Sequence, residues 1–208
     1  MATFTNAATL SYNGNTLVSN TVTGTLQELL TVSKTAVGDT YAPNGEAVFA
    51  VSLVNSGAAA LTGLTLNDNL GAYAYNTSTL YPLTYIDGSI QYYINGVLQA
   101  APTATAGPPL VISGINVPAG GNALLVYKAK VNEYAPPAQG STITNTASVT
   151  GAGISTAVTD QAVITAQAAP ELRIIKSLSP TTVSDNGELT YTFTIQNYGN
   201  TAAAETDN

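Results

Sequence analysis

Three polar residues lie at positions where the surrounding pattern requires apolar ones. In an extended strand every second side chain points to the same face, and Lys34, Asp68 and Asn145 each share their face with apolar neighbours. If those faces point inward, a lysine, a carboxyl group and an amide are all buried. Because an isolated buried charge is very costly, we expect the three side chains to be partners.

The order of these residues along the chain indicates a chemistry. A lysine on the first strand, an acid on a middle strand and an asparagine on the last resemble the layout of the intramolecular isopeptide bonds in Gram-positive pilin and collagen-adhesin domains. Burial favours the neutral amine of Lys34, which can attack the side-chain carbonyl of Asn145. It also favours protonated Asp68, which would polarise that carbonyl and shuttle protons while ammonia leaves. Two interpretations stay open: a hydrogen-bonded cluster without the bond, and strands whose faces do not bring the residues into contact.

The composition excludes most other chemistry. The 208 residues include no His, Cys or Trp, so imidazole acid–base pairs, thiol nucleophiles, thiolate or imidazole zinc sites and disulfides are excluded. We therefore expect no cofactor, no bound metal and no enzyme activity on a substrate. A net charge of −7 with five basic residues argues against nucleic acid as a partner. The apolar runs are too short to span a membrane, so we expect no membrane insertion.

Strand patterns position these residues. Segments rich in Thr, Val, Ile and Tyr alternate between polar and apolar side chains and are separated by turn signals such as Asn95-Gly96. This pattern predicts an all-β protein, and the number of short strands favours an immunoglobulin-like β-sandwich over a closed barrel. The clearest predicted strands are residues 31–37, 47–54, 61–66, 89–98, 123–131, 141–149 and 157–166.

The chain also repeats itself. The segment that begins at Leu30 and contains Lys34 recurs 142 residues later as Leu172 to Lys176, followed in both copies by Gly-Glu and by Asn-Ser-Gly or Asn-Tyr-Gly. The segment around Asn6 matches the one around Asn145. We therefore predict tandem repeats whose boundaries do not coincide with the ends of the chain. Residues 1–29 form the closing hairpin of one repeat, 30–169 form a complete β-sandwich, and 170–208 form the opening strands of a second repeat. We expect the native chain to continue beyond Asn208.

These repeated motifs resemble the conserved repeat domain known as domain of unknown function eleven, which occurs in bacterial and archaeal surface proteins. The resemblance rests on the lysine-bearing first strand, the Gly-Glu pair, the Asn-Ser-Gly turn, the strand end at Asn67 to Leu70 and the Thr-Asn-Thr-Ala segment from Thr144. It implies an immunoglobulin-like sandwich in tandem copies, a location on the cell surface or an appendage, and a structural or adhesive role.

The incomplete repeats suggest a way to assemble. Asn6 and Lys176 also lie on apolar faces, and each lacks a partner within its own fragment. We predict that the N-terminal hairpin of one copy completes the C-terminal partial repeat of the next, so that the chain is its own partner in a head-to-tail polymer. A covalent bond between Asn6 and Lys176 would join neighbouring copies. In the other interpretations, residues 1–29 fold back onto their own chain or form a disordered arm.

The predicted function is thus a structural subunit of a self-assembling extracellular or spore-surface filament. The alternative is a cell-surface adhesin that binds glycans or protein through a Tyr-rich insertion containing Tyr73, Tyr75, Tyr81, Tyr85, Tyr92 and Tyr93.

The Asp185 to Glu188 segment is interpreted as a turn rather than a calcium site. Because the first residues lack a secretory signal, we expect a removed leader, a non-standard export route or assembly on a forming spore.

Overall fold

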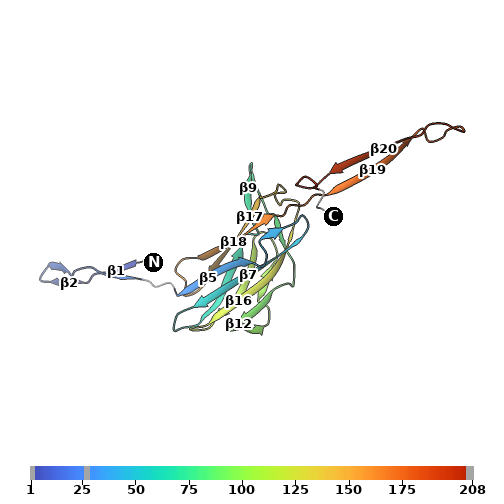
Figure 1. Ribbon diagram of the computed structural model, residues 1–208. Helices are drawn as coiled ribbons and strands as arrows, with labels where there is room; N and C mark the ends of the chain where they lie inside the picture. Colours follow the sequence, from blue (N-terminus) through green and yellow to red (C-terminus); the bar gives the residue numbers. More distant parts are fainter. Residues whose placement is uncertain (1–2, 26–28, 205–208) are drawn as a thin grey trace.

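The computed structural model describes residues 3–25 and 29–204, and within them it contains twenty β-strands and no helix. Most of these strands form two facing sheets, so the predicted all-β sandwich is confirmed (Figure 1). The first sheet has the order β13 (Val97–Gln99), β12 (Gln91–Ile94), β16 (Asn122–Val131), β7 (Glu46–Asn55) and β5 (Leu30–Ala36), with β11 (Leu83–Tyr85) also paired to β16. The second has the order β14 (Thr103–Thr105), β15 (Leu110–Val117), β8 (Leu61–Asp68), β17 (Thr142–Thr150), β18 (Val158–Ala166) and β6 (Thr40–Tyr41).

The core lies between the two sheets, where the alternating apolar residues meet. On β7 the side chains of Phe49, Val51 and Leu53 are fully buried, while their neighbours in sequence are partly or fully exposed. Leu66 on β8 is also fully buried and belongs to the same apolar cluster from the opposite sheet. Each such side chain contributes about 1.5–3 kcal/mol when it is removed from water, so this alternation holds the sandwich together.

The sheets also meet at one edge. The backbone N–H of Lys34 on β5 donates a hydrogen bond to the carboxylate of Asp160 on β18, with an N–O distance of 2.7 Å. This bond joins β5, an edge strand of the first sheet, to β18 of the second sheet and fixes the position of Lys34 relative to the second sheet. A short hairpin of β9 (Tyr73–Tyr75) and β10 (Ser78–Leu80) follows β8 and lies outside both sheets.

Two ribbons lie outside the sandwich (Figure 1). The N-terminal ribbon pairs β1 (Thr3–Asn6) with β4 (Val22–Thr25) and β2 (Thr9–Tyr12) with β3 (Asn15–Val18), and it extends away from the sandwich instead of folding onto it. The C-terminal ribbon pairs β19 (Leu172–Ser179) with β20 (Thr190–Asn197). At its base, the Asn200 side chain donates hydrogen bonds to the carbonyls of Pro137 and Gln167. Among the residues described, no helix is long and apolar enough to cross a membrane.

Candidate functional site

Four polar side chains from both sheets meet in the apolar core. Lys34 comes from β5, Asp68 is the last residue of β8, Tyr127 comes from β16 and Asn145 from β17. Lys34 is 3% exposed, and the other three are fully buried. The strands place them there because each occupies an inward position of its alternating pattern. We refer to these four residues as the core polar cluster.

The carboxylate of Asp68 is the centre of the core polar cluster. Its Oδ2 accepts hydrogen bonds from the Lys34 ammonium and from the Tyr127 hydroxyl, and the lysine contact is also an ion pair. Its Oδ1 accepts the backbone N–H of Leu70 at 2.9 Å. Both oxygens are therefore occupied, which is the condition for keeping a carboxylate in an apolar interior.

The amide of Asn145 is attached to the same group of residues. Its Nδ2 donates to the Tyr127 hydroxyl oxygen at 3.3 Å, and its Oδ1 accepts the backbone N–H of Gly71 at 3.3 Å. The Gly71 N–H is shared with the side chain of Asn69, at 3.0 Å. Leu70 and Gly71 both have positive φ, 52° and 73°, so two successive N–H groups point to the side-chain oxygens of Asp68 and Asn145.

Burial shifts the pKa values of two members of the core polar cluster, Lys34 and Tyr127. Desolvation lowers the pKa of Lys34, an effect that the attraction of Asp68 opposes. Desolvation raises the pKa of Tyr127 well above its ordinary value, and the nearby Asp68 charge adds to this shift. The Lys34 nitrogen also lies 5.1 Å from the centre of the Phe49 ring and 5.9 Å from that of Tyr127. The lysine thus lies between a carboxylate and two aromatic rings.

The structure brings Lys34, Asp68 and Asn145 together: Lys34 contacts Asp68, and Asn145 is joined to Asp68 through the Tyr127 hydroxyl. The covalent bond between Lys34 and Asn145 stays a prediction.

Sequence reasoning missed Tyr127, although it lies on an apolar face between Leu125 and Ala129. A tyrosine in that phase buries a hydroxyl that needs a partner, and this signal could have been used.

The two residues predicted to join neighbouring copies lie on different ribbons. Asn6 ends β1 and Lys176 lies on β19, and both are exposed. The Lys176 nitrogen lies 4.4 Å from the centre of the Tyr191 ring and 5.3 Å from that of Phe193. Tyr191 occupies the position equivalent to Phe49, so Lys176 shares one aromatic neighbour with Lys34, but in a solvent-exposed setting.

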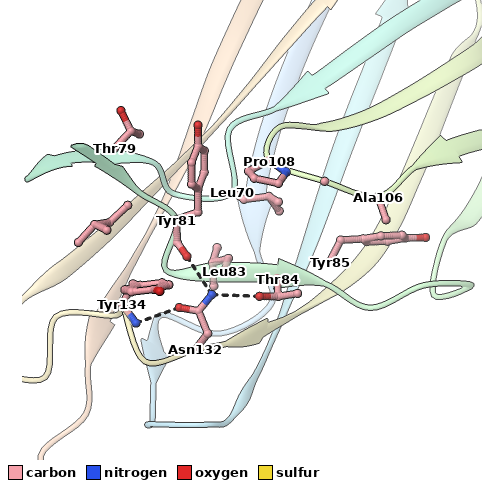
Figure 2. Close-up of a pocket in the computed structure, with 12 residues that line it drawn as sticks. Leu70, Thr79, Tyr81, Leu83, Thr84, Tyr85, Ala106, Pro108, Asn132 and Tyr134 are labelled. Atoms are coloured by element: carbon pink, nitrogen blue, oxygen red, sulfur yellow. Dashed lines mark hydrogen bonds between the residues drawn. The ribbon is translucent and has the colours of Figure 1, made fainter. Parts of the chain in front are cut away.

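The tyrosines of the insertion do not form one patch. Tyr92 is buried, and its hydroxyl donates to the Asn116 carbonyl, whereas Tyr75 is exposed on the β9–β10 hairpin. Tyr81 and Tyr85 line a cavity of about 340 Å³ together with Tyr134, which was not predicted (Figure 2). Its other lining residues include Leu70, Leu83 and Pro108.

Asn132 organises the wall of this tyrosine cavity. Its Nδ2 donates to the Tyr81 carbonyl at 2.8 Å and to the Thr84 hydroxyl at 3.0 Å, and its Oδ1 accepts the Tyr134 N–H at 3.0 Å (Figure 2). The hydroxyl of Tyr73 donates to the Tyr134 carbonyl at 2.7 Å. The tyrosine cavity is therefore fixed by hydrogen bonds and presents aromatic rings and hydroxyl groups.

The segment considered as a calcium site forms a turn. Asn186 has a φ of 65°, and the Gly187 N–H donates to the Ser184 carbonyl at 2.9 Å. Within residues 3–25 and 29–204, no three or more Asp or Glu side chains are grouped in a way that could hold a metal ion.

The solved structures that this chain resembles include two major pilin subunits and the domain of an adhesin. The major pilin subunit BcpA of Bacillus cereus matches with a TM-score of 0.51 and 13% identity, over 94% of this chain and 63% of that one. The major pilin SpaD of Corynebacterium diphtheriae matches with a TM-score of 0.48 and 13% identity, over 72% and 37%. The N-terminal domain of the Streptococcus gordonii adhesin Sgo0707 matches with a TM-score of 0.49 and 10% identity, over 76% and 37%.

The likeness to BcpA shows an immunoglobulin-like pilin fold, and this chain spans less than two thirds of that protein. No family model matches the chain, and no curated protein sequence matches it. Membership of the repeat family that its motifs resemble stays a prediction, as does the division into one complete and two partial repeats.

Proposed function

We propose that the protein is the structural subunit of a filament on the surface of a cell or spore. The N-terminal ribbon of one copy docks on the C-terminal ribbon of the next. One observation carries this proposal: both ribbons expose apolar residues whose counterparts in the sandwich are buried. The protein that it resembles at a TM-score of 0.51 is a major pilin subunit, which fits this role.

The C-terminal ribbon is paired like β5 and β7 of the sandwich. Leu30 pairs with Asn55 and Lys34 with Val51, and 142 residues later Leu172 pairs with Asn197 and Lys176 with Phe193. The turns that follow also agree. Asn55 and Asn197 each accept the N–H of the residue two positions ahead and donate to the carbonyl four positions ahead. The ribbon therefore has the conformation of two strands of a sandwich sheet.

The faces of this ribbon differ from their sandwich counterparts in exposure. Tyr191 and Ile195 are 50% and 66% exposed, whereas Phe49 and Leu53, at the equivalent positions of β7, are fully buried. Covering such side chains yields about 1.5–3 kcal/mol each. An uncovered apolar face of this kind marks an interaction site.

The N-terminal ribbon provides a cover of the matching type. Phe4 is 56% exposed, and its counterpart Ile143 on β17 is 2% exposed. In the sandwich, β17 and β18 lie across the core from β5 and β7. An N-terminal ribbon placed on the C-terminal ribbon in the same way would restore that contact, and it would bring Asn6 to Lys176 as Asn145 is brought to Lys34.

This contact joins two different surfaces, so it leaves one ribbon free at each end of a dimer. Such head-to-tail contacts continue into a polymer. Within each copy, a covalent bond between Lys34 and Asn145 would tie the first strand of the sandwich to its late strand. A bond between Asn6 and Lys176 would do the same between copies, with an acid supplied from outside the two ribbons.

Removal of the N-terminal ribbon tests the proposal. The full chain should sediment as polymers, whereas a chain that lacks residues 1–24 should remain monomeric and should stop growth when it is added in excess to the full chain. Unchanged polymers without residues 1–24 would show that the ribbon does not make the contact.

A second candidate function is adhesion through the tyrosine cavity. Its rings and hydroxyl groups suit the stacking and hydrogen bonding of a neutral sugar. Saturable binding to a glycan array that is lost in Tyr81→Ala, from a protein that stays monomeric, would favour this function over the filament.

A further inference from the structure

We propose that Tyr127 is a catalytic residue of the bond-forming reaction between Lys34 and Asn145. Its role is to pass a proton from Asp68 to the Asn145 nitrogen, which leaves as ammonia. This inference rests on the cross-link within the sandwich that forms part of the proposed function, and it assigns a role to the one member of the core polar cluster that the sequence did not single out.

The position of the Tyr127 hydroxyl carries the inference. The hydroxyl donates its proton to Oδ2 of Asp68 and accepts a hydrogen bond from Nδ2 of Asn145 at 3.3 Å. The same Asp68 oxygen accepts a hydrogen bond from the Lys34 nitrogen. A continuous path of hydrogen bonds thus leads from the attacking nitrogen to the leaving nitrogen. Because Asp68, Tyr127 and Asn145 are fully buried, protein groups must move the proton.

The reaction needs this path for a simple reason. Lys34 first gives a proton to Asp68 and becomes a neutral amine. The amine attacks Cγ of Asn145, so that a C–N bond forms and the carbonyl electron pair moves to Oδ1. At this stage the attacking nitrogen carries an excess proton, while the amide nitrogen lacks the proton that it needs to leave as ammonia.

The hydroxyl of Tyr127 corrects this mismatch. It gives its proton to Nδ2 of Asn145 while Asp68 protonates the tyrosine oxygen and takes the excess proton from the Lys34 nitrogen. The carbonyl then re-forms, the bond between Cγ and Nδ2 breaks, and ammonia leaves. Tyr127 ends as it began, Asp68 ends protonated, and the six exchangeable hydrogens of the starting groups are conserved.

The surroundings favour this role over that of a passive neighbour. The raised pKa of Tyr127 keeps its hydroxyl protonated until the reaction starts. The ring is held by Phe49, at a centroid distance of 5.7 Å, so that the hydroxyl stays between Asp68 and Asn145. The Gly71 N–H faces Oδ1 of Asn145, where negative charge develops during the attack.

The test compares rates of bond formation in the full chain. Protein made in a cell-free extract is quenched in acid at intervals, and its intact mass reports the loss of one ammonia. General acid–base catalysis typically contributes 10²–10⁴-fold, so Tyr127→Phe should form the bond roughly 100-fold more slowly or worse. Tyr92→Phe is the matched control, because it removes a buried hydroxyl outside the core polar cluster.

A second variant guards against a folding defect in Tyr127→Phe. Site-specific replacement of Tyr127 by a fluorinated tyrosine keeps the ring and the hydroxyl but makes the hydroxyl more acidic, so the rate should change while the melting temperature does not. A wild-type rate in both variants would overturn the role of Tyr127 and leave the bond standing. A wild-type chain that keeps its full sequence mass would overturn both the bond and this inference.

Discussion

Gly71 offers a sharp test of how the core polar cluster is held. Its backbone has a φ of 73°, and an added Cβ would lie 2.5 Å from Cγ2 of Ile143 and 3.0 Å from Cγ of Pro82. The left-handed conformation costs a non-glycine residue about 1–2 kcal/mol, and forcing a methyl group into a packed core costs about 1–3 kcal/mol. Gly71→Ala should therefore lower the free energy of unfolding by roughly 2–5 kcal/mol.

Gly88 is the matched control for this prediction. It has nearly the same φ, 72°, but an added Cβ meets no atom within 4 Å. Gly88→Ala should show the backbone cost alone, about 1–2 kcal/mol. Urea unfolding of both variants gives the difference. Equal losses in the two variants would refute the claim that Gly71 is required by close packing against β17.

The core polar cluster and the C-terminal ribbon can be tested by three more substitutions. In Asn145→Ala, which leaves the Lys34 amine free, the unfolded chain holds the Lys34 proton up to about its ordinary pKa of 10.5, while the folded chain releases it at lower pH. The free energy of unfolding, measured with urea, should therefore rise with pH below about 10. It should fall above that pH, because folded Tyr127 keeps a proton that the unfolded chain loses. In the same Asn145→Ala background, where Lys34 keeps its ammonium, adding Asp68→Ala leaves this buried charge without its carboxylate and should lower the free energy of unfolding by about 3–5 kcal/mol more, measured by the same titration. Ile195→Asp should abolish sedimentation of polymers, whereas Val97→Asp, which changes an equally exposed residue of β13, should not.

Much of the sandwich follows from local sequence. The alternation in residues 47–54 predicts β7, and Asn95-Gly96 predicts the hairpin between β12 and β13, because both signals depend only on neighbouring residues. Alternation also places Lys34 on an inward face. These features arise because side chains alternate between the two faces of an extended strand, so each residue of the segment shows the pattern.

Contacts between distant segments were harder to predict. Tyr127 joins Asp68 to Asn145 across two sheets, and no local pattern reports the registers that align the strands. The left-handed corner at Leu70 and Gly71 was also missed, since only tertiary packing places a non-glycine residue there. The repeat was visible in the sequence, but the equal pairing of Lys34 with Val51 and of Lys176 with Phe193 emerges only from the structure.

Negative-stain electron microscopy of the purified full chain tests the central claim most directly. We expect unbranched filaments one subunit wide, because each copy offers one N-terminal and one C-terminal ribbon. Dispersed single particles at every protein concentration would contradict it.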